Sequence, residues 1–126
     1  MTIFMDDGGG VTSESIKYFR DIIPNLQEII KVEVSFEALR RVAVFDVLQF
    51  WTKEYTMILT DMSHNEMWLS GVNCSYGGEG PNGSYVILRE LGFIPRGTSF
   101  NDSGLASAKA IIFTRDSKGI PQVEVK

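Results

Sequence analysis

The stretch Tyr76–Ser84 is the part of the sequence best suited to chemistry, because four of the seven positions from 77 to 83 are glycine. Glycine loses more conformational entropy on folding than other residues, so this density predicts a backbone shape that side chains would obstruct. A strand, a glycine loop and a helix start, in that order, direct several N–H groups at an anion. We therefore predict ligand contacts from Gly77, Gly78, Glu79, Gly80, Asn82 and Gly83.

The glycine stretch does not identify one ligand by itself. It matches neither the dinucleotide fingerprint nor the P-loop, since no lysine follows the last glycine. Glu79 is either an acceptor for ribose hydroxyls or a solvated side chain. The structural alternative for the whole stretch is a tight connection between a hairpin and a helix.

A second candidate segment, Pro95–Gly104, combines one cation, one aromatic ring and several short polar side chains. Such groups pair a phosphate, stack a purine and hold a ribose. We predict that Arg96 pairs a phosphate, that Phe100 stacks a base and that Asn101 is a polar contact. Arg115 is a further cation for the same ligand. The alternative is a solvated loop with Phe100 in the core.

No catalytic or metal-binding pattern accompanies these segments. A thiol nucleophile needs a base within hydrogen-bond reach, and we expect His64 and Cys74 at opposite ends of one strand. Cys74 is better explained as a buried structural cysteine. No set of His and Cys residues has zinc spacing. We therefore expect no enzyme, no metal and no cofactor.

Composition predicts one globular domain over residues 1–126. Hydrophobic residues make up 44% of the chain and charged residues 22%, with a net charge of −4. The negative charge argues against a DNA or RNA polymer as partner, because such proteins neutralise phosphates with a basic face. No apolar run reaches the length of a membrane span. A single cysteine indicates a reducing, cytoplasmic compartment.

The hydrophobic pattern predicts an α+β fold: an antiparallel sheet from two hairpins, with helices on one side. The first hairpin covers 55–61 and 66–73, and the second covers 109–115 and 120–125, where Pro121 places the last strand at an edge. A short strand is expected at 31–34. A short helix follows the glycine stretch, capped by Ser84 and stopped by Gly92.

Two regions are open to different interpretations. Residues 1–10 are either a frayed, flexible terminus or a short strand leading through glycines into a helix that Thr12 or Ser13 caps and Pro24 limits. Residues 36–51 suit both periods, and we predict a helix early, capped by Ser35, and a strand late. The aromatics are expected in the core or at a subunit interface, which indicates a homo-oligomer: Phe45, Phe50, Trp51, Tyr55 and Trp68.

The segment Tyr76-Gly77-Gly78-Glu79-Gly80-Pro81, ahead of a short helix ending Leu91-Gly92-Phe93, resembles the phage Thoeris anti-defence sponge proteins of the first type. The N-terminal helical part and the hairpin fit the same layout. The resemblance implies a protein that binds a cyclic ADP-ribose signal without cleaving it, as a homo-oligomer with pockets near subunit contacts. It also implies action in the cytoplasm of an infected bacterial host, and some such proteins also bind cyclic oligonucleotides.

The runner-up is a small protein-interaction or immunity-type module whose acidic surface covers a basic partner. Its sign would be a contiguous acidic face around Asp6, Asp7, Glu14 and Asp21, without a concave pocket.

Overall fold

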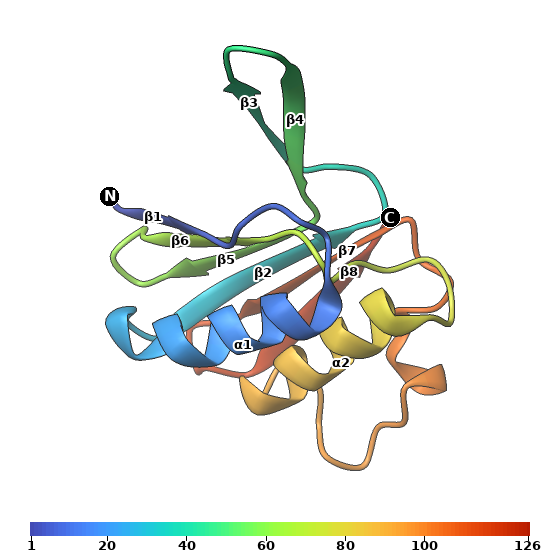
Figure 1. Cartoon of the computed structure of the whole chain (residues 1–126). Coiled ribbons are helices and arrows are strands. Elements are labelled where there is room, and N and C mark those ends of the chain that lie inside the picture. Colours follow the sequence, from blue (N-terminus) through green and yellow to red (C-terminus); the bar gives the residue numbers. More distant parts are fainter.

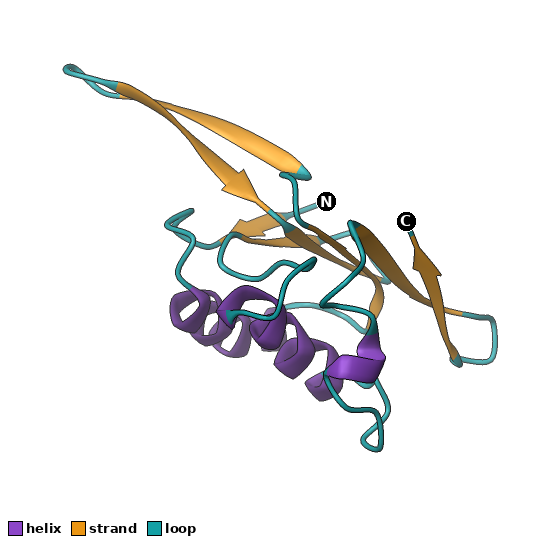
Figure 2. Cartoon of the chain, turned by 90° about the vertical axis from the view of Figure 1, so that its right-hand side faces the viewer, coloured by secondary structure: helices purple, strands orange, loops and turns teal.

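The computed structural model describes residues 1–126 and shows an α+β fold in which two helices cover one face of a six-stranded sheet (Figure 1). The sheet has the strand order β1-β6-β5-β2-β7-β8. A separate two-stranded sheet, β3-β4, projects from the opposite side (Figure 2). The elements are β1 (Ile3–Met5), α1 (Thr12–Ile22), η1 (Ile23–Asn25), β2 (Ile29–Ser35), β3 (Arg40–Phe45), β4 (Phe50–Tyr55), β5 (Met57–Asp61), β6 (Glu66–Leu69), α2 (Glu79–Glu90), η2 (Asn101–Ser103), β7 (Ala110–Arg115) and β8 (Pro121–Val125).

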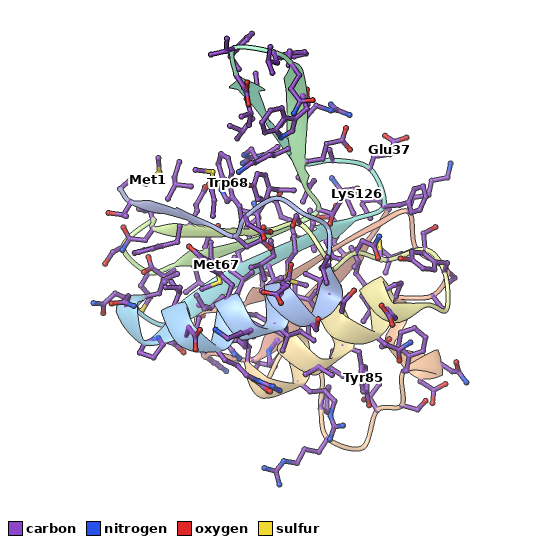
Figure 3. The ribbon with its side chains drawn as sticks, in the orientation of Figure 1. Met1, Glu37, Met67, Trp68, Tyr85 and Lys126 are labelled. Carbon is purple, nitrogen blue, oxygen red and sulfur yellow. The ribbon has the colours of Figure 1, made fainter.

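Alternation along the strands places one core between sheet and helices. On β2, Val32 and Val34 face the helices and are fully buried, whereas Lys31 and Glu33 face away and form an ion pair of 2.7 Å. Met67 and Trp68 on β6 likewise point to opposite faces (Figure 3). The core cluster has 18 buried residues and takes Phe19 from α1 and Ile87 and Leu88 from α2.

Both expected hairpins are present, with shorter strands than the sequence suggests. β5 pairs with β6 and β7 with β8, all antiparallel, and Pro121 opens the edge strand β8. β6 ends at Leu69 rather than residue 73, because the N–H of Ser70 donates to the Asp6 carboxylate and that of Gly71 to Ser15 Oγ. These donors are therefore not available for the sheet.

The first ten residues form the short-strand alternative. β1 runs parallel to β6, with Met5 in register with Trp68, in a sheet whose other pairs are antiparallel. The chain then passes through Gly8–Gly10 into α1, and Pro24 lies in η1 directly after α1 ends. The residue at the N-cap position is Val11, so neither Thr12 nor Ser13 caps the helix as expected.

The prediction of a helix early in 36–51 was wrong. Ser35 ends β2, and the region forms β3 and β4, which contain the branched residues Val42 and Val44 and several aromatic residues. Branched and aromatic side chains favour a pleated strand.

The helix after the glycine stretch begins earlier than expected. α2 starts at Glu79, so Ser84 is an interior residue, buried, with its Oγ donating to the Asn73 carbonyl at 2.7 Å. Pro81 lies in the first turn, where its missing N–H is not needed. The predicted stop is confirmed, because Gly92 follows the last turn with a φ of +81° that favours glycine.

Candidate ligand groove between the helices

The glycine stretch forms the loop before α2 and the first turn of that helix, where Gly80 and Gly83 lie close to neighbouring side chains. A Cβ on Gly80 would lie 2.1 Å from Asn73 Oδ1, and one on Gly83 would lie 2.5 Å from Thr12 Cγ2 and 2.8 Å from Val72 Cγ1. Gly80 and Gly83 are therefore required by internal packing. A valine at Gly80 would disturb the fold as well as any ligand. Gly77, in contrast, has open space around it.

A groove of about 350 Å³ lies between the first turns of α1 and α2. Both helices run in the same direction, so their N-termini are at the same end of the molecule (Figure 1). Of the predicted residues, Glu79, Asn82 and Gly83 line the groove. The remaining lining residues are Thr12, Ser13, Ile16 and Val86.

Neither helix is capped by a side chain, which leaves donors at this end. The N–H groups of Thr12, Ser13 and Glu14 in α1, and of Glu79 and Gly80 in α2, have no acceptor within the protein. Free N–H groups and the helix dipole both favour an anion at a helix N-terminus. Two such termini side by side add their fields at the same groove.

A buried carboxylate fixes the start of α1. Asp6 is 5% exposed and accepts hydrogen bonds from Ser15 Oγ, from the N–H and hydroxyl of Ser70 and from the Gly8 N–H. Gly71 lies so close to Val11 that a Cβ would be 2.4 Å from its carbonyl. Asp6 and Gly71 thus hold the α1 N-terminus against the chain after β6, beside α2.

Cationic side chains continue along α2 from the groove. Val86 also lines a neighbouring hollow of about 300 Å³ with Arg89, Glu90 and Arg96. Glu90 is paired with Arg20, whereas Arg89 and Arg96 have no carboxylate partner. The guanidinium of Arg89 lies over the Tyr85 ring, 5.3 Å from its centroid. Arg96 is therefore the predicted residue of the 95–104 segment that the fold brings next to the groove.

Phe100 and Asn101 lie elsewhere. Phe100 packs against the core and meets the Tyr85 ring edge-to-face at 5.9 Å, and the Tyr85 hydroxyl donates to the Thr98 carbonyl at 2.6 Å. The structure therefore has the second of the two arrangements considered for Phe100, in which its ring packs against the core instead of facing a ligand. Asn101 is exposed in η2 and lines no hollow.

Arg115 is committed to the opposite end of α2. Its guanidinium donates to the carbonyls of Leu91, Ile29 and Gly119 and lies 4.2 Å from the centre of the Phe93 ring. A cation at a helix C-terminus stabilises the helix dipole. The structure therefore does not bring Arg115 to the predicted site.

His64 lies in the turn before β6, and Cys74 lies in the loop between β6 and α2 rather than at the end of the strand. Cys74 is fully buried, and burial raises the pKa of its thiol to about 11, so the thiol is protonated at neutral pH. His64 is in the turn before β6, with a left-handed φ of 64°. No group of three or more His, Cys, Asp or Glu side chains is arranged to hold a metal ion.

Two further hollows flank other parts of the surface. The acidic residues singled out from the sequence do come together, around a hollow of about 140 Å³ with Lys17 and Tyr18: Asp6, Asp7, Glu14 and Asp21. A larger hollow of about 500 Å³ lies between Phe36, Ser75 and Lys109. Ser75 has a φ of +84° there, and its N–H donates to the Leu105 carbonyl at 2.7 Å.

Sequence reasoning missed Thr12, Ser13, Ile16 and Val86 as lining residues. The signal available was Gly8–Gly10 before a helix start, which resembles the second glycine stretch before α2. Treating Thr12 or Ser13 as a cap assigned their hydroxyls to the helix and left no reason to place a ligand there.

Comparisons with known proteins give no match among family descriptions, curated proteins or solved structures. Neither helix is long and apolar enough to cross a membrane.

Proposed function

We propose that this protein binds a small anionic nucleotide in the groove between α1 and α2 and holds it without chemical conversion. The observation that carries the proposal is that two uncapped helix N-termini open into the same groove. Backbone N–H groups bind phosphate without a net positive charge, which suits a chain of net charge −4. Arg89 and Arg96 extend the site by charge-assisted contacts to a second phosphate.

Because the 76–81 segment resembles the Thoeris anti-defence sponge proteins, the ligand that we propose is a cyclic ADP-ribose-type immune signal. On this proposal the protein sequesters the signal in the cytoplasm of an infected bacterial host and so inhibits anti-phage defence, as a homo-oligomer. Sequestration needs affinity alone. Consistent with this, the buried Cys74 is not available as a nucleophile.

Calorimetric titration with cyclic ADP-ribose tests the site through Ser13→Glu and Arg96→Ala. A glutamate in the first turn suits the helix dipole, so Ser13→Glu should fold normally while adding a second carboxylate beside that of Glu79, which repels the phosphate. Arg96→Ala removes a charge-assisted pair of about 1.5–3 kcal/mol, so each variant should bind about ten- to a hundredfold more weakly. The matched controls are Ser117→Glu and Lys118→Ala, in the exposed β7–β8 turn.

Unchanged affinity in both variants would show that the nucleotide does not bind in the groove. Release of the intact nucleotide on heating supports sequestration, whereas a converted product would indicate an enzyme. Absence of nucleotide retention would favour the second candidate.

The second candidate is a protein-interaction module. The exposed carboxylates of Asp7, Glu14 and Asp21 favour it, because they converge on one hollow, whereas the Asp6 carboxylate in the same hollow is buried and accepts internal hydrogen bonds. The hollow also contains Lys17, which is paired with Asp21 at 3.1 Å, so part of the charge is compensated. A basic partner would bind here in a salt-dependent way.

A further inference from the structure

The hollow of about 500 Å³ at one end of the six-stranded sheet is separate from the groove between the helices. It lies where the end of β2, the loop after β6 and the start of β7 meet, near the C-terminus (Figure 1). Six residues from these three segments line it: Ser35, Phe36, Glu37, Ser75, Lys109 and Ala110. None of them lines the groove, so the hollow is a second cavity that the proposed function does not use.

Backbone hydrogen bonds hold the three segments in place around the hollow. Ser35 and Ala110 are in register across β2 and β7. The Phe36 N–H donates to the Lys109 carbonyl at 3.0 Å, and the Ser75 N–H donates to the Leu105 carbonyl at 2.7 Å. The hollow is therefore pre-formed, and its volume is in the range of small-molecule sites, about 300–1,000 Å³.

The backbone of Ser75 is strained beside the hollow. Its φ of +84° lies in the left-handed region, which residues other than glycine rarely adopt. Such conformations persist where the surrounding structure holds them, and they cluster at functional sites. This observation is independent of the size of the cavity, and it concerns a residue that lines the cavity.

The polar groups around the hollow lack partners within the protein. Ser35 is 7% exposed, and its Oγ accepts from the Glu37 N–H at 3.1 Å, so the hydroxyl hydrogen has no acceptor of its own. Neither the Glu37 carboxylate nor the Lys109 ammonium is in an ion pair. A carboxylate, an ammonium and a buried donor thus meet at one space, and buried donors are normally satisfied.

An aromatic ring forms the apolar wall of the hollow. Phe36 is 57% exposed, and its ring meets that of Tyr76 edge-to-face, with 6.3 Å between the centroids. Tyr76 is the first residue of the glycine stretch. The Phe36 ring is therefore supported on one side and free on the other, where it can contact a second aromatic ring.

We propose that this hollow binds a free aromatic α-amino acid. The Glu37 carboxylate accepts from the ligand ammonium, Lys109 pairs with the ligand carboxylate, and the Ser35 hydroxyl donates to the same carboxylate. The ligand ring packs on Phe36. A zwitterion matches one cation and one anion, whereas a phosphate would face the like charge of Glu37. The inference does not depend on the proposed nucleotide, because the ligand and the residues are different.

Titration of the ¹⁵N-labelled protein with L-phenylalanine, followed by NMR, tests the site. Saturable shifts should occur at residues 35–37, 75–76 and 109–110 and not in the groove between the helices. Phe36→Ala should weaken binding about tenfold, because the ligand loses its aromatic contact. The matched control is Phe50→Ala on β4, where the ring is exposed to a similar extent, 60%, and binding should not change.

Two modified ligands test the charge pairing. Lys109→Gln should weaken binding of L-phenylalanine about three- to fivefold but should not weaken binding of its amide, which has no carboxylate. Glu37→Gln should weaken L-phenylalanine to a similar extent but not N-acetyl-L-phenylalanine, which has no ammonium. Lys118→Gln, in the exposed β7–β8 turn, is the control and should bind all three as the wild type does.

Several outcomes would overturn the proposal. One is an absence of saturable binding up to roughly 10 mM L-phenylalanine, the level of a very weak complex. Another is a set of shifts confined to the groove between the helices. Equal affinities of Phe36→Ala and Phe50→Ala would exclude the ring contact, and equal losses for all three ligands in both charge variants would show a structural effect instead of charge pairing.

Discussion

Two hairpins that are adjacent in the chain have opposite surroundings. β3–β4 ends at Tyr55, and β5–β6 begins two residues later at Met57. In β5–β6 the apolar residues Met57, Leu59 and Met67 are fully buried beneath the helices. In β3–β4 the aromatic residues at the tip meet only each other, with Phe45 and Phe50 at a centroid distance of 5.0 Å.

The difference teaches that hydrophobicity alone does not determine burial. Both hairpins have strand-forming residues, and both turns contain an aspartate that accepts backbone hydrogen bonds. Only β5–β6 lies between other strands and beneath helices. The layer of helices over the sheet stabilises β5 and β6, whereas the β3–β4 hairpin has no such cover from its own chain.

The largest expected contrast comes from one substitution made in both hairpins. Leu59→Ala should lower the free energy of unfolding by about 3 kcal/mol, because it leaves a cavity in the core. Leu48→Ala, at the exposed tip, should change it by less than about 0.5 kcal/mol. Urea denaturation at the lowest workable protein concentration measures both, so that self-association does not contribute.

Equal changes in the free energy of unfolding from the two leucine substitutions would contradict the difference in burial between the two hairpins. A large effect of Leu48→Ala that disappears on dilution would instead place the tip in an interface.

The next contrast concerns the aspartates in the two turns. The Asp61 carboxylate accepts hydrogen bonds from the backbone N–H groups of Gln27, Ser63 and Asn65 and from the Asn65 side-chain amide. The Asp46 carboxylate accepts one hydrogen bond, from the backbone N–H of Leu48. Asp61→Asn should destabilise the fold by about 1–3 kcal/mol, because buried donors lose a charged acceptor. Asp46→Asn is the matched control and should change stability little.

The same aspartate predicts an acid dependence. Burial alone would raise the pKa of Asp61, but its hydrogen bonds outweigh that effect and hold the pKa below its usual range. A lowered folded-state pKa stabilises the protein above the unfolded value, near 3.9, and this contribution is lost as the pH falls through the folded-state pKa. The urea midpoint of the wild type should therefore fall more between pH 6 and pH 3 than that of Asp61→Asn. Equal falls would contradict the assignment.

The smallest effect is expected inside the β3–β4 hairpin. The Phe45–Phe50 pair contributes about 0.5–1 kcal/mol to the hairpin, so Phe45→Ala should speed amide exchange in β3 and β4 about two- to fivefold. Exchange in β5 and β6 should not change, because β3 and β4 share no strand pairing with them. Val123→Ala on β8 is the control. Faster exchange throughout the sheet would show that the β3–β4 hairpin and the six-stranded sheet unfold together.

Local sequence determined the elements whose signals lie within a few residues. Alternating apolar residues gave both sheet hairpins, Pro121 the edge strand and Gly92 the end of α2, since side-chain periodicity and backbone φ are local properties. The start of α2 was misplaced because Ser84 has the character of a cap, and only its buried bond to Asn73 shows that it lies inside the helix. The helix expected early in 36–51 failed because both periods fit the residues.

Tertiary structure alone decided which residues meet. Thr12 and Gly83 are far apart in the sequence, yet they line one groove because Asp6 and Gly71 hold the α1 N-terminus beside α2. Arg115 was directed away from that groove by the carbonyls at the end of α2, and Phe100 by the Tyr85 ring. Such contacts depend on how distant segments pack, and a single sequence records the residue types but not the packing partners. The sequence therefore determined the fold class and its hairpins, and the packing of α1 against α2 determined the candidate site.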